Sequence, residues 1–151
     1  MIKSILIPVD GSEHSVKALT LAVDIAEKND ATLSVLFVAA HEIDGDLHRF
    51  AATEYSSEYI PKHDRVVRVI SEDIGKSTIK GLINKLKTNV VIKTVVLFGN
   101  PADQIVKYSM NNNFDMVVMG HRGLSDIKGM LMGSVSRKVR QLVECTFVSI
   151  K

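Results

Sequence analysis

The chain has 151 residues, of which 46% are hydrophobic and 24% are charged, a composition typical of one globular domain. Its single cysteine, Cys145, excludes a disulfide within the chain and a zinc site made of several thiolates. The net charge is only +2, the basic residues are scattered, and no apolar run reaches the roughly 18 residues of a membrane helix. We therefore expect one cytoplasmic domain over residues 1–151, with no nucleic-acid or membrane partner.

Short apolar runs rich in β-branched residues predict the strands. In chain order these runs are Ser4–Val9, Thr32–Val38, Val90–Leu97, Met116–Met119 and Thr146–Ile150. Several of them are apolar on both faces, which is typical of parallel strands covered by helices on each side.

Segments with helical periodicity separate these strands. Ser12 is a predicted N-cap for the first helix, whose apolar face is expected to comprise Val16, Leu19, Val23 and Ala26. Further helices are expected around Ile79–Leu86, from Asn100-Pro101 to about Asn111, and over Ser134–Glu144.

The alternation of strands and helices predicts an α/β fold, with a mostly parallel open sheet, right-handed crossovers and helices on both faces. The least regular segment is His41–His63, which follows the second strand. We interpret it either as a mobile or partly helical connection that covers a ligand, or as a variable surface insertion.

The most informative pattern is Gly120-His121-Arg122-Gly123, followed after nine residues by Gly133-Ser134-Val135-Ser136. Its first two glycines permit positive φ and close approach of the backbone. The second group opens a helix, whose first N–H groups have no partner within the helix. Loop amides, a helix N-terminus and the hydroxyls of Ser134 and Ser136 together predict a phosphate site. Nearby positive charge comes from Arg122, Lys128, Arg137 and Lys138.

Two common phosphate loops, G-x-x-x-x-G-K-[ST] and a G-x-G-x-x-G after the first strand, do not occur in the sequence. The first strand ends instead in Pro8-Val9-Asp10-Gly11-Ser12. In a doubly wound sheet this strand lies beside the one that carries Gly120, so we expect Asp10 to face the crevice. A carboxylate there suits a ribose hydroxyl pair or a metal ion held by phosphates. The alternative is that Asp10 caps the first helix.

Over its whole length the chain resembles the universal stress proteins, and specifically their ATP-binding branch. Three segments carry the resemblance. They are the opening strand and turn Ile5–Ser12, the second strand Thr32–Val38, and the signature Gly120-x2-Gly123-x9-Gly133-Ser134. One departure is Thr146, where the family often has a proline.

The resemblance implies an adenine-nucleotide α-hydrolase-like fold with five parallel strands in the order 3-2-1-4-5. It also implies that Asp10 holds the ribose of ATP and that the backbone of Val38 reads the adenine edge. The other implied contacts are Pro8 and Val9 against the base, Met119 and Gly120 along the pocket, Gly123, Gly133, Ser134 and Ser136 around the triphosphate, and the main chain of Val135. Mg²⁺ is implied to be held mainly by the phosphates, with no metal ligand from the protein.

The function implied by the resemblance is nucleotide-dependent sensing or signalling under stress, with a downstream partner that the sequence does not identify. In the implied strand order, Thr146–Ile150 is an edge strand with neither charge nor proline. We therefore expect a homodimer in which two copies of this strand pair. The alternative is that a loop or Lys151 protects this edge.

Alternative functions remain at this stage. The alternatives to an ATP-binding stress protein are an adenine-nucleotide hydrolase or adenylating enzyme of the same fold, an RNA-binding protein that uses Gly120–Gly123 as a KH-type loop, and an interaction module that binds no nucleotide. We assign no catalytic residue, and slow ATP hydrolysis stays open. The 5 histidines match no metal-binding motif, and we expect the side chain of His121 to point to water.

Overall fold

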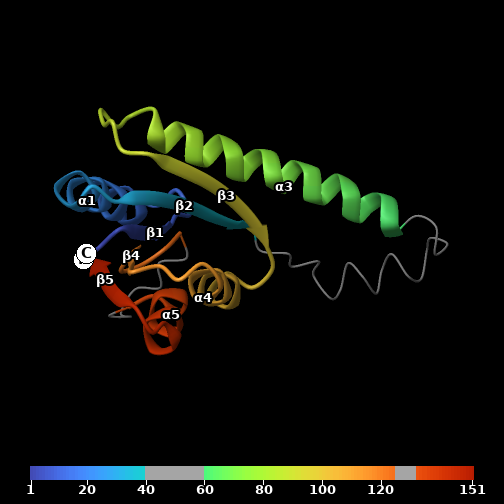
Figure 1. Cartoon of the computed structure of the whole chain (residues 1–151). Helices are drawn as coiled ribbons and strands as arrows, with labels where there is room; N and C mark the ends of the chain where they lie inside the picture. The colour runs from blue at the N-terminus through green and yellow to red at the C-terminus, as the bar shows by residue number, and fades with distance from the viewer. Residues whose placement is uncertain (40–59, 125–131) are drawn as a thin grey trace.

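The predicted strands form one parallel sheet in the computed structural model of the chain, which describes residues 1–39, 60–124 and 132–151 (Figure 1). The strands are β1 (Ser4–Pro8), β2 (Thr32–Ala39), β3 (Ile92–Phe98), β4 (Met116–Gly120) and β5 (Thr146–Ile150). Each neighbouring pair is parallel, and the order is β3-β2-β1-β4-β5. The α/β fold and the strand order 3-2-1-4-5 are therefore confirmed.

Helices cover both faces of the sheet, as predicted. They are α1 (Glu13–Asn29), α3 (Ile60–Ile83), α4 (Pro101–Asn111) and α5 (Ser134–Leu142). Helices α1 and α3 pack on one face, and α4 and α5 pack on the other (Figure 1). Among the described residues, no helix is both long enough and apolar enough to cross a membrane.

The core consists of two clusters that the central strands separate. Successive side chains of β1 point to opposite faces: Ile5 and Ile7 pack on the α1 side, and Leu6 packs on the α4 side. All three are fully buried. Strand β4 divides in the same way between Val118 and Val117. Because both faces of β1 and β4 are covered, the carboxyl ends of these central strands are held in fixed positions.

Helix α1 begins at the predicted cap. The hydroxyl of Ser12 accepts a hydrogen bond from the backbone N–H of Ser15 at 3.2 Å. Asp10 does not cap α1, because its Oδ1 accepts instead from the N–H of Ser12 at 2.9 Å. Val16 was expected on the apolar face but is 37% exposed. The buried face of the helix comprises Ser15, Ala18, Leu19, Ala22, Val23 and Ala26.

Helix α3 differs most from the prediction. It ends at Ile83 and tightens there, since the N–H of Leu86 donates to the carbonyl of Ile83 at 2.9 Å, so Leu86 lies beyond the helix. It begins at Ile60, inside the segment that we interpreted as irregular. Pro61 falls in the first turn, where its missing N–H breaks no helical hydrogen bond. The rest of the predicted connection, residues 40–59, lies outside the described residues.

The remaining boundaries agree with the sequence to within two residues. Asn100 caps α4, and its side chain accepts from the N–H of Asp103 at 3.2 Å; Pro101 is the first helical residue, as predicted. Helix α5 ends at Leu142 instead of Glu144. Strand β3 begins at Ile92 instead of Val90.

Candidate functional site

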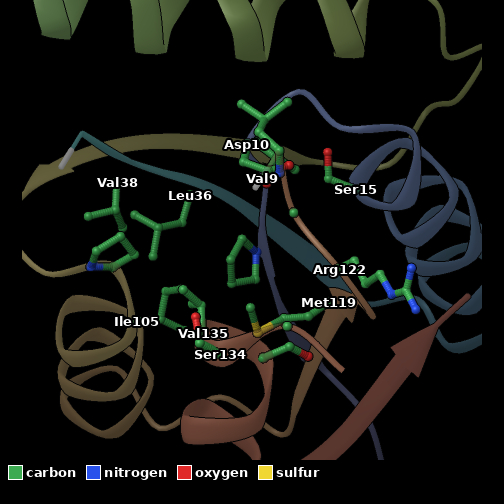
Figure 2. Close-up of a pocket in the computed structure, with 17 residues that line it drawn as sticks. Val9, Asp10, Ser15, Leu36, Val38, Ile105, Met119, Arg122, Ser134 and Val135 are labelled. Atoms are coloured by element: carbon green, nitrogen blue, oxygen red, sulfur yellow. Dashed lines mark hydrogen bonds between the residues drawn. The ribbon is translucent and has the colours of Figure 1, made fainter. Parts of the chain in front are cut away.

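A cavity of about 440 Å³ lies at the carboxyl ends of β1, β2 and β4 and extends to the first turns of α4 and α5 (Figure 2). Its volume is within the range of roughly 300–1,000 Å³ that small-molecule sites occupy. All predicted site residues line it, namely Pro8, Val9, Asp10, Val38, Met119, Gly120, Gly123, Gly133, Ser134, Val135 and Ser136. The fold thus brings together predicted residues from four separate segments, whose role in binding stays a prediction.

One part of the cavity is apolar. Leu36 and Val38 from β2 lie together with Ile105 from α4 on one side of it (Figure 2). Leu36 is fully buried, and Ile105 is 3% exposed. This part can hold a flat apolar group such as an aromatic base. Sequence reasoning missed several of the lining residues, namely Ser15, Leu36, Pro101, Ile105 and Leu124.

The other part is formed by the turn after β4 and the start of α5. The N–H of Gly133, the N-cap of α5, donates to the carbonyl of His121 at 2.9 Å and ties the two segments together. A Cβ on Gly133 would lie 3.4 Å from the Cα of Arg122. The cap has no side-chain hydrogen bond to the helix. Because this end of α5 carries the positive end of the helix dipole, it is suited to an anion.

Ser136 adds an unusual feature to this part. It lines the cavity and is only 3% exposed. Its hydroxyl oxygen is buried and has no hydrogen-bond partner among the described residues. A buried polar group without a partner costs about 1–3 kcal/mol. A ligand oxygen that pairs with this hydroxyl would recover that cost, so the feature favours a polar ligand at the start of α5.

Close packing explains the glycines of the turn. The sequence allowed a positive φ at Gly120 and Gly123, but neither residue adopts one. A Cβ on Gly120 would lie 2.8 Å from the Cβ of His14 and 3.0 Å from the N of Ser15. A Cβ on Gly123 would lie 2.5 Å from Oδ2 of Asp10. Both glycines are therefore required because another group occupies the space of a side chain.

Asp10 faces the cavity, as predicted, and is half-buried. Both of its carboxylate oxygens accept backbone hydrogen bonds: Oδ1 from Ser12 at 2.9 Å and Oδ2 from Leu124 at 3.0 Å. The carboxylate thus joins the turn after β1 to the turn after β4.

The predicted basic residues contribute less positive charge to the cavity than expected. Arg122 lines the cavity, but its guanidinium points away from the centre (Figure 2). Lys138 is in an ion pair with Asp103 at 2.7 Å, and Arg137 is exposed. Lys128 lies outside the described residues. Within the described part of the chain no lysine lines the cavity.

His121 contacts the edge strand, whereas the sequence suggested that it points to water. Its Nδ1 lies 3.1 Å from the hydroxyl of Ser149, and its N–H donates to the carbonyl of Ile150 at 2.6 Å. Burial lowers the pKa of His121, and the positive charges of Lys151 and Arg122 lower it further. Over residues 1–39, 60–124 and 132–151, no group of three His, Cys, Asp or Glu side chains is placed to hold a metal ion.

Fold and site together define a doubly wound α/β protein with a cavity at the carboxyl ends of its central strands. The model of the Universal stress protein family matches residues 1–151. Universal stress protein YxiE from Bacillus subtilis (strain 168) is 32% identical over 159 residues, and the alignment covers 100% of both chains. This chain therefore belongs to the universal stress protein family.

Solved structures agree with this assignment at the level of the fold. Universal stress protein UspA from Lactobacillus plantarum has a TM-score of 0.74 and 22% identity, and the match covers 99% of this chain and 97% of that one. A universal stress protein family protein from Arabidopsis thaliana with AMP bound has a TM-score of 0.66 and 21% identity, covering 99% of this chain and 91% of that one.

Proposed function

We propose that this chain is an ATP-binding stress-response module that senses or signals nucleotide status and does not act mainly as an enzyme. In this proposal the adenine lies between Val38 and Ile105, the ribose lies at Asp10, and the phosphates lie along Gly123 and the start of α5. We also propose the cytoplasmic location expected from the sequence, since the cytoplasm contains the nucleotide.

The observation that carries the proposal is the combination of two unlike parts in one cavity. Leu36, Val38 and Ile105 offer an apolar slot, and the first turn of α5 offers N–H groups without a partner in the helix. Beside them lies the hydroxyl of Ser136, which has no hydrogen-bond partner among the described residues. A nucleotide has the same division between an apolar base and an anionic tail. The AMP bound to the Arabidopsis relative adds support for an adenine nucleotide.

Bound Mg²⁺ would neutralise part of the phosphate charge. The described residues offer the ion no cluster of acidic ligands, so the proposal assigns it to the phosphates, with Asp10 as the nearest carboxylate of the cavity. Catalysis is not part of the proposal. The described lining has no lysine to stabilise a transferring phosphoryl group, and its carboxylate already accepts two backbone N–H groups.

The test is calorimetric titration of the purified protein with ATP, ADP and AMP in the presence of Mg²⁺, after mass analysis of any nucleotide that co-purifies. Gly133→Val is expected to weaken ATP binding by more than about tenfold, because the added side chain fills the space between α5 and the turn after β4. Gly81→Ala is the matched control, since a Cβ there meets nothing within 4 Å. No binding of any of these nucleotides by the wild-type protein would contradict the proposal.

A two-fold homodimer through β5 completes the proposal. The N–H of Thr146 donates to the backbone carbonyl of Asp115, and the carbonyl of Ile150 accepts from the N–H of His121. The backbone groups of Thr146 and Ile150 therefore point toward β4. Because backbone groups alternate along a strand, Phe147 and Ser149 direct theirs to the open edge. Sedimentation should therefore give a dimer for the wild type and for Ser149→Ala, and a monomer for Ser149→Pro. A monomeric wild type at micromolar concentration would refute the dimer.

A further inference from the structure

We propose that Asp10 positions the phosphate-binding turn, so that its carboxylate contributes to recognition of the phosphates and not only of the ribose. This inference rests on the proposed function and assigns Asp10 a second role in the same site. It makes Asp10 a positioning residue for the turn that carries Gly123 and Leu124.

The geometry begins with the two hydrogen bonds of the carboxylate. Oδ1 accepts from Ser12, two residues further along the chain, and this bond fixes the orientation of the carboxylate relative to β1 and α1. Oδ2 accepts from the N–H of Leu124 at 3.0 Å, across 114 positions of sequence. Hydrogen bonds to a charged acceptor are stronger than those between neutral groups. A rigid part of the fold therefore holds the turn after β4.

The absence of a side chain at Gly123 is a second sign that the carboxylate of Asp10 packs against this turn. A Cβ on this residue would lie 2.5 Å from Oδ2 of Asp10, closer than real Cβ atoms approach an oxygen. Since Gly123 has no positive φ, the carboxylate is what excludes a side chain there. The need for glycine at the second position of the signature is therefore explained by the carboxylate of Asp10, without reference to a ligand.

The position of the turn also sets the width of the phosphate site. The N of Gly123 lies 3.8 Å from where a Cβ on Gly133 would be, so the turn and the start of α5 face each other closely. If Asp10 releases Leu124, the turn is free to shift relative to α5. Phosphates that need N–H groups from both segments would then lose their preorganised contacts.

Positioning does not compete with ribose binding. An ionised carboxylate has about four lone-pair sites, and the bonds from Ser12 and Leu124 use two of them. The remaining sites can accept from ribose hydroxyls while the turn stays in place. Asp10 would therefore couple the sugar end of the ligand to its phosphate end.

Ligands that lack either the ribose or the phosphates separate the two roles. Binding of ATP, adenosine and inorganic tripolyphosphate is measured for wild type, Asp10→Ala and Asp10→Asn. If Asp10 positions the turn, Asp10→Ala lowers the affinity for ATP about tenfold more than that for adenosine, and it also weakens tripolyphosphate, which has no ribose. Asp24→Ala, an exposed aspartate on α1, is the matched control and should change none of these affinities. Equal losses for ATP and adenosine would overturn the inference.

A double-mutant cycle tests the contact with Gly123 directly. Gly123→Ala alone should weaken ATP binding, because its methyl group must displace the carboxylate. The same substitution should cost little further affinity when Asp10→Ala has removed that carboxylate, so the two effects should be strongly non-additive. Additive losses would show that the two residues act independently and would overturn the inference.

The backbone N–H of Leu124 provides a readout that needs no nucleotide. In the nucleotide-free protein, Asp10→Ala should raise the hydrogen-exchange rate of this amide and shift its proton resonance, while Asp24→Ala should not. An unchanged Leu124 amide would contradict the positioning role. If the wild type binds neither ATP nor tripolyphosphate, the proposed function fails together with the phosphate part of this inference, and the Leu124 amide still decides whether Asp10 holds the turn.

Discussion

Gly120 at the end of β4 lies directly against His14 in the first turn of α1. A Cβ on Gly120 would lie 2.8 Å from the Cβ of His14 and 2.9 Å from its carbonyl carbon. The carbonyl carbon is part of the helix backbone, so it cannot move aside as a flexible side chain would. The close approach of β4 and α1 therefore fixes the end of the strand from which the turn with Gly123 begins.

We expect Gly120→Ala to lower the free energy of unfolding by about 1–3 kcal/mol, because the methyl group overpacks this contact. Gly81→Ala should have the opposite sign and raise stability by about 0.5–1 kcal/mol, since alanine favours a helix and its Cβ meets no atom within 4 Å. Urea unfolding of both variants measures the difference. Equal stability of Gly120→Ala and wild type would show that β4 and α1 do not pack as described.

Ser136→Ala should weaken ATP binding without lowering the stability of the fold. Its buried hydroxyl has no partner among the described residues, so removing it should leave the nucleotide-free protein equally stable or up to about 1 kcal/mol more stable. ATP affinity should fall about tenfold, because a hydrogen bond to a phosphate oxygen is lost. Thermal unfolding with and without MgATP measures both effects.

Ser109→Ala is the control for that experiment. Ser109 is also buried, at 4% exposure, but its hydroxyl contacts the thiol of Cys145 at 3.7 Å, and it does not line the cavity. It should not change ATP affinity. A Ser136→Ala variant that is destabilised but binds ATP normally would exclude a role for the hydroxyl in binding.

Protonation of His121 should destabilise the fold. Its pKa is lowered by burial and by the positive charges of Lys151, Arg122 and His14, whereas in the unfolded chain it is about 6.5. Between these two pKa values the unfolded chain binds more protons, so stability falls as the pH drops below about 6.5 and levels off below the folded pKa. Comparison of urea midpoints across this window should show a smaller slope for His121→Asn. An identical slope in both proteins would contradict this assignment.

Protonation of Asp115 should likewise destabilise the fold, but at lower pH. Its Oδ2 accepts the N–H groups of Lys3 at 2.8 Å and Ser4 at 2.9 Å, and these bonds lower its pKa. The contribution to stability is present above the unfolded pKa of about 3.9 and is lost as the pH falls through the folded pKa. Asp115→Asn should therefore be less stable at pH 7 and show a weaker acid transition, with unchanged ATP affinity because Asp115 lies at the opposite ends of the strands. Asp24→Asn, which is exposed, provides the comparison.

Local chemistry explains what the sequence could predict. Ser12 and Asn100 cap their helices through contacts three residues away, and Pro101 takes the first helical position next to its cap. These signals depend only on neighbouring residues. Strands β1 and β4 were equally clear, because they are covered on both faces and therefore apolar at nearly every position. The signature glycines indicated the place of the cavity because they follow such a strand, and sites of open parallel sheets lie at the carboxyl ends of the strands.

Contacts between distant segments explain what the sequence could not predict. Leu36 and Ile105 carry the same apolar signal as any core residue, so nothing local marks them as cavity lining. The bond between Asp10 and Leu124 spans 114 positions, and its geometry follows only from the placement of β1 beside β4. The start of α3 at Ile60 was missed because we interpreted Pro61 as part of an irregular connection, although proline is also common in the first turn of a helix.

The most direct test is a crystal structure of the protein with MgATP. We predict phosphate oxygens within about 3 Å of backbone N–H groups of the turn at Gly123 and of the hydroxyl of Ser136, with adenine between Val38 and Ile105. A cavity that stays empty at saturating nucleotide, or ATP bound elsewhere with these N–H groups unoccupied, would contradict the account.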